Sequence, residues 1–191
     1  EKAFLKTLNN FKNSNFVKVK CLSVHIGSQI TDYKPYLKMI NELDRIIKKS
    51  NHYFEYIDLG GGMGIQYEKK TKLFNYKKYN SIIKNFLKKH KVKIIFEPGR
   101  AIIANSAVLF TQIIYIKNTD KKKFIILDAA MNDFMRPALY GSFHNIIPLL
   151  KKNKKSKKIH DFVGPICETT DRFLSLKGFQ NLKEKEFLPI S

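Results

Sequence analysis

Residues 56–64 read Tyr-Ile-Asp-Leu-Gly-Gly-Gly-Met-Gly, and this change from a short apolar run to glycines decides how the surrounding chain is interpreted. The apolar run, residues 53–59, is short and is typical of a strand in a buried sheet. Glycines directly after such a strand let the backbone turn tightly or approach a bound anion closely. A tight turn is the more common outcome, so the glycine run alone is weak evidence for a ligand.

The segments on either side of this run repeat the same order of elements. Residues 17–24 change from alternating apolar and polar side chains to an apolar run, and residues 92–96 form a further short apolar segment, so both are predicted strands. Between the strands, apolar side chains recur at helical spacing in residues 36–47 and 76–87. Asp32 can cap the first of these helices. Strands that alternate with helices indicate parallel strands joined by helical crossovers.

Further along the chain the pattern changes. Residues 107–116 and 123–127 favour strands and are separated by a polar turn cluster, which predicts an antiparallel hairpin. Another strand is expected at residues 159–163. We therefore expect an α/β part in residues 1–105 and an antiparallel β part in residues 106–191.

The composition excludes several functional classes. An apolar fraction of 43% can fill a core, and no apolar run approaches the roughly 18 residues that a membrane span needs. A net charge of +20 suggests nucleic acid as a partner. However, only four of the 36 basic residues are Arg, and the densest Lys run, residues 151–158, has no aromatic side chain that could stack on a base. We therefore expect no nucleic acid and no membrane as partner.

The two cysteines predict neither a disulfide framework nor a metal site. Cys21 and Cys167 lie far apart in the sequence, and neither has a second Cys or a His at the spacing of a metal finger. A cytoplasmic location fits this cysteine content. The chain begins at Glu1 without a hydrophobic leader, and we expect this end to be internal to a longer protein.

Each predicted parallel strand ends in small or polar residues that a core does not need. The first strand is followed by His25 and Ser28, the second by the glycine run, and the third by Glu97 and Arg100. Because ligands bind at the carboxyl ends of parallel strands, these three ends are expected to form one site. Arg100 and Ser28 can bind a phosphate together with the backbone amides of the glycines.

Two of these side chains indicate more than anion binding. Glu97 at the end of a buried strand needs a cation or a protonated ring nitrogen as partner, and His25 can stack on a flat ring or transfer a proton. A phosphorylated aromatic cofactor with a basic ring nitrogen, such as pyridoxal phosphate, would satisfy all of these groups. Two alternatives stay open: Glu97 and Arg100 could form a structural ion pair, and His25 could be a core histidine.

Five segments together resemble the diaminopimelate decarboxylase family, which lies in the alanine racemase and ornithine decarboxylase fold group. They are VHIGSQI at 24–30, IDLGGGMGIQY at 57–67, FEPGRAIIAN at 96–105, LDAAMNDFMRPALYGSFH at 127–144 and VGPICETTD at 163–171. The glycine run and EPGR are shared by the wider decarboxylase group, whereas RPALYG followed by CETTD is close to specific for this branch.

The resemblance implies a role for each matching residue. The implied cofactor-binding residues for pyridoxal 5'-phosphate are His25, Ser28, Gly60, Gly61, Gly62, Glu97, Pro98, Gly99 and Arg100. The implied substrate-binding residues are Arg100, Arg136, Tyr140 and Glu168. Cys167 would return a proton to the substrate carbon after carbon dioxide leaves, with His25 as the other implied catalytic residue. Two interpretations without a functional role remain open: Cys167 could be an inert buried thiol, and Tyr140 could be an ordinary core residue.

The resemblance further implies a lyase of lysine biosynthesis that converts meso-2,6-diaminopimelate to L-lysine and carbon dioxide. The active unit would be a homodimer in which Cys167 and Glu168 enter the partner's site. The expected fold is the C-terminal part of a pyridoxal-phosphate-binding (β/α)8 TIM barrel followed by part of an antiparallel β domain. Only three of the eight βα units of a barrel are visible, and no Lys lies in the motif that carries the cofactor, so the chain is expected to be an inactive fragment.

Two other functions remain open at this point. One is a decarboxylase of the same fold that acts on arginine, ornithine or a carboxylated polyamine. Such an enzyme is expected to have an acidic residue at the position of Arg136, which would bind the distal end of the substrate. The other is a non-catalytic relative that binds pyridoxal phosphate, which is expected to have lost Cys167 or Glu97, and both are present.

Overall fold

A computed structural model describes residues 1–67 and 71–191 of the chain. The chain divides into two compact units, residues 1–104 and residues 105–191. Each unit has its own sheet and its own cluster of buried apolar side chains, and each is described by itself. No helix in the described residues is long and apolar enough to cross a membrane.

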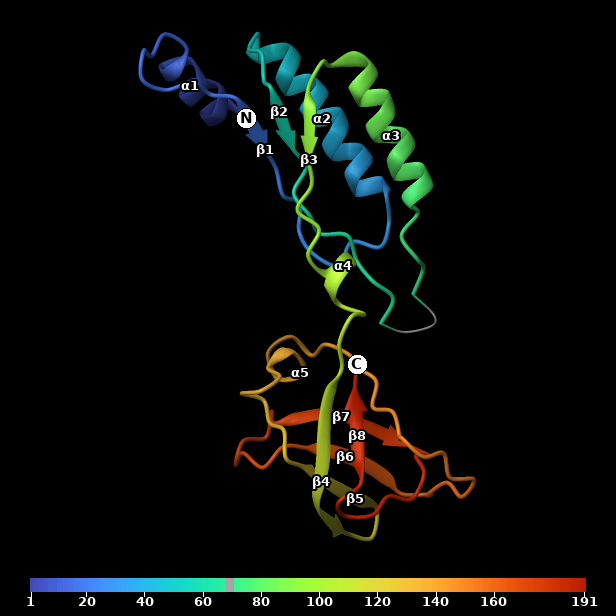
Figure 1. Cartoon of the computed structure of the whole chain (residues 1–191). Coiled ribbons are helices and arrows are strands. Elements are labelled where there is room, and N and C mark those ends of the chain that lie inside the picture. Colours follow the sequence, from blue (N-terminus) through green and yellow to red (C-terminus); the bar gives the residue numbers. More distant parts are fainter. Residues whose placement is uncertain (68–70) are drawn as a thin grey trace. The chain divides into compact units, whose positions relative to one another are not determined.

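The first unit is built on a three-stranded parallel sheet of order β1-β2-β3 (Figure 1). Its elements are α1 (Lys2–Phe11), β1 (Cys21–Ser23), α2 (Lys34–Ser50), β2 (Tyr56–Asp58), α3 (Tyr76–Lys89), β3 (Lys93–Ile95) and α4 (Arg100–Ile103). Ile57 in the central strand is paired with Leu22 on one side and Ile94 on the other. The predicted order of parallel strands joined by helices is therefore confirmed, with strands shorter than expected.

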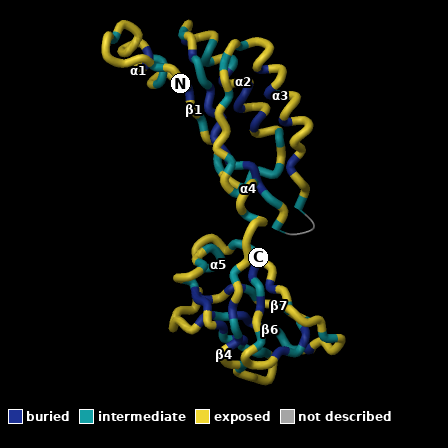
Figure 2. The backbone as a smooth tube through the Cα atoms, viewed as in Figure 1, coloured by how far each residue is buried: buried dark blue, intermediate teal, exposed yellow. Residues whose placement is uncertain are grey.

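Helices α2 and α3 lie side by side and pack against one face of this sheet (Figure 1). Tyr36 and Leu43 of α2 and Phe86 of α3 are almost completely buried, together with Ile57 of β2. The carboxylate of Asp32 accepts the amide of Lys34, the first residue of α2, at 3.0 Å. The N-cap residue is Tyr33 and its side chain makes no capping bond, so the predicted cap by Asp32 is wrong. Burial in this unit is concentrated in the central strand and the inner faces of α2 and α3 (Figure 2).

The third strand is less buried than the sequence suggests. Ile95 is 40% exposed and Phe96 is 41% exposed, and Glu97 is also exposed. The reason is that β3 is an edge strand in the described part of the chain, and α2 and α3 cover only one face of the sheet. The expected cost of a buried, unpaired Glu97 carboxylate therefore does not arise within this unit.

The second unit is a five-stranded sheet of order β7-β6-β5-β4-β8 with one short helix (Figure 1). Its elements are β4 (Leu109–Asn118), β5 (Lys122–Leu127), α5 (Arg136–Tyr140), β6 (Ile159–Val163), β7 (Arg172–Lys177) and β8 (Phe187–Ile190). The predicted hairpin is confirmed, because β4 and β5 are antiparallel neighbours. One pair departs from the expected antiparallel order: β5 and β6 run parallel, because the long segment between them returns the chain to the same end of the sheet.

Candidate functional site

Hydrogen bonds from backbone amides join the three strand ends of the first unit. The amide of Gly61 donates to Nδ1 of His25 at 3.3 Å, which links the end of β2 to the end of β1. The amide of Glu97 donates to the carbonyl of Gly60 at 2.9 Å, which links the end of β3 to the same glycine run. The structure therefore brings His25, the glycines and Glu97 to one edge of the sheet.

The glycines are required because other backbone segments lie against them. A Cβ atom on Gly61 would lie 2.0 Å from the carbonyl oxygen of Glu97. A Cβ on Gly62 would lie 2.2 Å from the carbonyl oxygen of Gly27, and one on Gly60 would lie 2.6 Å from that of Val24. These separations are far below van der Waals contact, so only glycine permits the strand ends to meet this closely.

Two buried polar side chains form hydrogen bonds with the backbone of the glycine run. The carboxylate of Asp58 accepts the amide of Gly60 at 2.8 Å and the hydroxyl of Ser23 at 3.2 Å. The hydroxyl of Tyr36 donates to the carbonyl of Gly61 at 2.9 Å, and burial, followed by the charge of Tyr76, raises the pKa of Tyr36 to about 12. Tyr36 therefore stays a neutral hydrogen-bond donor at physiological pH.

The orientation of the Gly61–Gly62 peptide follows from this bond. The described peptide bonds are trans, so the N–H of a peptide points opposite to its C=O. Because the carbonyl of Gly61 points to Tyr36 of α2, the amide of Gly62 points away from that helix. An amide directed out of the glycine run in this way can donate to an anion.

A second network fixes the arginine of the third strand end. Arg100 donates to Oε1 of Gln29 at 3.0 Å. The same amide side chain is tied to Ile65, donating to its carbonyl at 2.6 Å and accepting its amide at 3.3 Å. The guanidinium also lies 5.9 Å from the ring centre of Tyr67. No ion pair joins Glu97 to Arg100 within residues 1–67 and 71–104, so the structural ion pair considered above is not formed.

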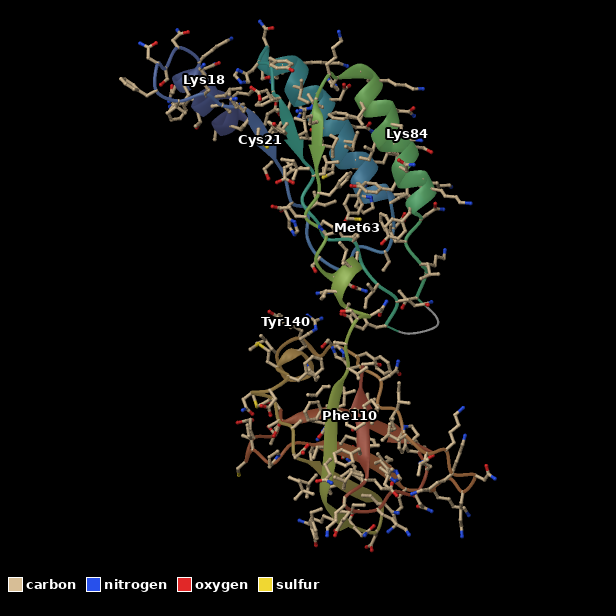
Figure 3. All side chains as sticks on the ribbon, in the orientation of Figure 1. Lys18, Cys21, Met63, Lys84, Phe110 and Tyr140 are labelled. Carbon is tan, nitrogen blue, oxygen red and sulfur yellow. The ribbon has the colours of Figure 1, made fainter. Side chains whose placement is uncertain are left out.

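The remaining predicted residues of the first unit lie at its surface. His25 and Ser28 are exposed, so the alternative of a core histidine is wrong for His25. Pro98 is partly buried and Gly99 is exposed, and no atom lies within 4 Å of a Cβ built on Gly99. Met63, labelled in Figure 3, forms an isolated parallel bridge with Ile30 just beyond the glycines.

The predicted substrate residues of the second unit fall on two segments. Arg136 and Tyr140 are the ends of α5, a single helical turn, and the guanidinium lies 5.8 Å from the tyrosine ring centre, as their spacing of four predicts. Tyr140 is 68% exposed and is labelled in Figure 3, so it is not a core residue. Cys167 and Glu168 lie in the loop between β6 and β7, and the Cys167 thiol is exposed rather than buried.

Several residues that organise these segments were not identified from the sequence. Gln29 and Asp58 both lie in the segments quoted above but had no assigned role, whereas Tyr36 was counted only as part of an apolar helix stripe. Asp171 likewise ends the CETTD segment without a role. The signal that could have drawn notice to Gln29 and Asp58 is a polar side chain directly beside a glycine-rich strand end.

Comparisons with known proteins identify the family to which this fold belongs. Residues 28–191 match the family described as pyridoxal-dependent decarboxylase, C-terminal sheet domain. The chain therefore belongs to the pyridoxal-dependent decarboxylase family. Within that family it is similar to the diaminopimelate decarboxylase of Aquifex aeolicus, with 38% identity over 95% of this chain and 43% of the relative. The diaminopimelate decarboxylase of Haemophilus influenzae is 34% identical over 90% of the chain and 42% of the relative.

Solved structures give the same result. The diaminopimelate decarboxylase of Helicobacter pylori, crystallised with L-lysine, aligns with a TM-score of 0.88 and 34% identity over 100% of this chain and 48% of that chain. A Paramecium bursaria Chlorella virus arginine decarboxylase aligns with a TM-score of 0.84 at 20% identity, which shows the shared fold alone. The chain thus spans less than half the length of the three diaminopimelate decarboxylases named here.

Proposed function

We propose that this chain forms part of a pyridoxal-phosphate-dependent decarboxylase that converts meso-2,6-diaminopimelate to L-lysine and carbon dioxide. The observation that carries the proposal is the meeting of His25, the glycine run and the Glu97 segment at one sheet edge. The identity of 34–38% to diaminopimelate decarboxylases supports the choice of substrate. Because the chain spans under half of these relatives, the proposal concerns a longer protein that contains it.

The residues at the sheet edge fit a phosphorylated aromatic cofactor. Gly60, Gly61, Gly62, Ser28 and Arg100 would hold the phosphate, since they offer backbone amides, a hydroxyl and a guanidinium. The fit rests on the outward amide of Gly62 and on glycines whose Cβ atoms would collide with neighbouring backbone.

The two remaining groups suit the flat ring of the cofactor. His25 would lie against this ring, and the exposed Glu97 carboxylate would pair with its nitrogen, with Pro98 and Gly99 beside it. Because the Gly61 amide donates to Nδ1 of His25, that nitrogen is the unprotonated one. Both groups are accessible to a ligand, since each side chain is exposed.

The second unit would supply the substrate contacts and the proton. Bound pyridoxal phosphate provides an electron sink when the bond to the carboxylate breaks. Arg136 and Tyr140 would bind the substrate, together with Arg100 and Glu168. Arg136 and Glu168 carry opposite charges, as the ammonium and carboxylate at the distal end of diaminopimelate require. Cys167 would then donate its thiol proton to the carbon that lost the carboxylate.

We further infer the wider organisation of this enzyme. Residues 1–105 would form the last βα units of a (β/α)8 barrel, and residues 106–191 part of the C-terminal β domain. The enzyme would act as a cytoplasmic homodimer in which Cys167 and Glu168 serve the partner's site. The exposed thiol in the β6–β7 loop supports this arrangement, because a donor that reaches another subunit must lie at the surface.

A substrate panel tests this function. The full-length protein with pyridoxal phosphate should release carbon dioxide from meso-diaminopimelate with a kcat/KM at least 100-fold above that for arginine or ornithine. The rival decarboxylases predict the opposite ranking, and a non-catalytic relative predicts release from none of them. Either result would replace the proposal.

A further inference from the structure

We propose that Asp171 is a positioning residue that fixes the loop carrying Cys167 and Glu168 to the segment that leads into α5. The inference rests on the proposed function, because it concerns the two residues that act in that reaction. It assigns no contact with substrate or cofactor to Asp171 itself. All the observations that carry it lie within the second unit.

The loop between β6 and β7 is an exposed segment held at its two ends. Residues 165–170 are all exposed, whereas Gly164 and Asp171 on either side are buried. The amide of Gly164 donates to the carbonyl of Asp171 at 3.1 Å, which closes the loop at its base. The two functional side chains therefore lie on a segment whose shape depends on few internal contacts.

The carboxylate of Asp171 adds contacts to the loop's own backbone bonds, in which the amide of Glu168 donates to the carbonyl of Ile166 at 2.8 Å and the amide of Asp171 to that of Glu168 at 3.1 Å. One oxygen accepts the amide of Ile166 at 2.9 Å, inside the loop. The other accepts the amide of Met131 at 2.7 Å, in the segment between β5 and α5. Asp171 is only 3% exposed, so both bonds are shielded from water. Charged acceptors of backbone amides make some of the stronger hydrogen bonds in proteins.

Two further contacts tighten this connection. A Cβ atom on Gly164 would lie 2.3 Å from one carboxylate oxygen of Asp171 and 2.5 Å from the other, so the carboxylate lies directly against the glycine. The hydroxyl of Thr170 donates to the sulfur of Met131 at 3.9 Å. Met131 therefore contacts this region twice, through its amide to the carboxylate of Asp171 and through its sulfur to the hydroxyl of Thr170.

The connection continues to the other substrate residues. Met131 lies five residues before Arg136, the first residue of α5. Helix α5 packs against β7, the strand that begins directly after Asp171. One carboxylate thus holds the Cys167 loop in register with the helix that carries Arg136 and Tyr140.

Asparagine cannot replace the aspartate without loss. Both oxygens of Asp171 accept a backbone N–H, and an amide side chain has only one oxygen. In D171N the second position would present an N–H to another N–H donor. The substitution therefore breaks one of the two contacts while it keeps the size of the side chain.

The test uses the full-length holoenzyme with the variants D171N and D161N. Asp161 of β6 is a matched control, because it is also a buried aspartate of the second unit and accepts from Ser175 and from Lys122. Hydrogen exchange at the amides of residues 131 and 166 reports the contact. Alkylation of the exposed Cys167 by iodoacetamide reports the loop, with its rate compared between the variants and the wild-type protein.

In the wild-type protein, the amides of Ile166 and Met131 should exchange at least tenfold more slowly than that of Cys167. D171N should remove this difference for at least one of them and raise the rate of Cys167 alkylation at least threefold relative to the wild-type protein. Its kcat for diaminopimelate should fall at least tenfold and KM should rise, because the loop carries both Cys167 and the substrate-binding Glu168. Its affinity for pyridoxal phosphate should change less than threefold, because the proposed cofactor residues lie in the first unit. D161N should change neither loop measurement.

The remaining outcomes overturn the inference. Fast hydrogen exchange at the amides of Ile166 and Met131 in the wild-type protein would show that Asp171 does not hold them, and this result does not depend on whether the variants fold. Loss of protection in D171N with kcat within twofold of wild type would make Asp171 purely structural, and equal loss of kcat in D161N would indicate general destabilisation. A wild-type protein inactive toward diaminopimelate would instead reject the proposed function, while exchange and alkylation still decide whether Asp171 holds the loop.

Discussion

The hydroxyl of Tyr36 lies 2.9 Å from the carbonyl oxygen of Gly61 and donates a hydrogen bond to it across the interface between α2 and the end of β2. Tyr36 is completely buried, so the helix layer sets the direction of a peptide in the candidate phosphate site. The neighbouring Tyr79, whose ring centre is 4.9 Å away, has a buried hydroxyl without a hydrogen-bond partner in the described residues.

This difference predicts unequal effects for two similar substitutions. Tyr36→Phe leaves the carbonyl of Gly61 without its donor and should cost about 1–2 kcal/mol of folding free energy. It should also weaken pyridoxal phosphate binding about tenfold, because the Gly62 amide is no longer held outward. Tyr79→Phe, the matched control, should change both quantities little. Denaturant unfolding and absorbance titration with the cofactor measure them, and equal effects of the two variants would remove Tyr36 as a support of the site.

Gly61→Ala should damage the site by a purely steric route. The backbone of Gly61 is not in the left-handed region, but its Cβ would lie 2.0 Å from the carbonyl oxygen of Glu97. The end of β3 must move away, so we expect a loss of about 2–4 kcal/mol in stability and loss of cofactor binding. Gly99→Ala adds a methyl group where no atom lies within 4 Å and should cost less than about 1 kcal/mol. A Gly61→Ala protein with wild-type stability would contradict the packing described above.

Arg136→Ala should impair the use of diaminopimelate far more than the uptake of the cofactor. The side chain belongs to α5 in the second unit, whereas the proposed cofactor residues belong to the first. Loss of a charged hydrogen bond to the substrate should raise KM by roughly 10- to 100-fold, which corresponds to about 1.5–3 kcal/mol. Steady-state kinetics and cofactor titration separate the two effects. Equal damage to both would reject a substrate role for Arg136.

Cys167→Ala should slow turnover and leave cofactor absorbance intact. Removal of a general acid typically costs 10²–10⁴-fold in rate, so we expect kcat to fall by at least about 100-fold. The thiol is exposed and makes no packing contribution that would destabilise the sheet when it is removed. Cys21→Ala is the matched control, since this exposed cysteine has no proposed role. Turnover that is unchanged in Cys167→Ala would eliminate the thiol as the proton donor.

His160 predicts how the stability of the second unit depends on pH. Its ring is fully buried, and burial, followed by the charge of Lys123, lowers its pKa below the ordinary 6.5. The unfolded chain therefore binds this proton more readily than the folded protein. Stability from the neutral ring is complete above pH 6.5 and is lost as pH falls below it toward the folded pKa.

The variant His160→Leu should remove this part of the pH dependence. Denaturant unfolding of wild type and variant at pH 7.5 and pH 5 measures it. We expect the wild-type protein to lose more stability than the variant between these pH values. Equal losses would show that the imidazole does not remain neutral in the folded protein.

The sequence by itself determined the order of the three parallel strands, α2 and α3 in the first unit, and the hairpin of the second. Apolar periodicity reports local conformation and burial, which is why these elements were predicted, whereas α1 and α4 were not. The five quoted segments also identified the family, since they preserve chemically demanding residues in a fixed order. The limits of the strands and the parallel pairing of β5 with β6 were not predictable in this way, because they depend on which distant segment supplies the hydrogen bonds.

Only the tertiary structure decided how the candidate site is supported. Tyr36 looked like one more apolar residue of a helix, and its hydroxyl acquires a role only because α2 packs beneath the glycine run. Gln29 reaches both Ile65 and Arg100, and Asp171 reaches Met131, across separations in sequence that no local pattern encodes. The physical reason is that side-chain chemistry is written in the sequence, whereas the partner of each polar group is fixed only when the packed layers bring distant backbone within about 3 Å.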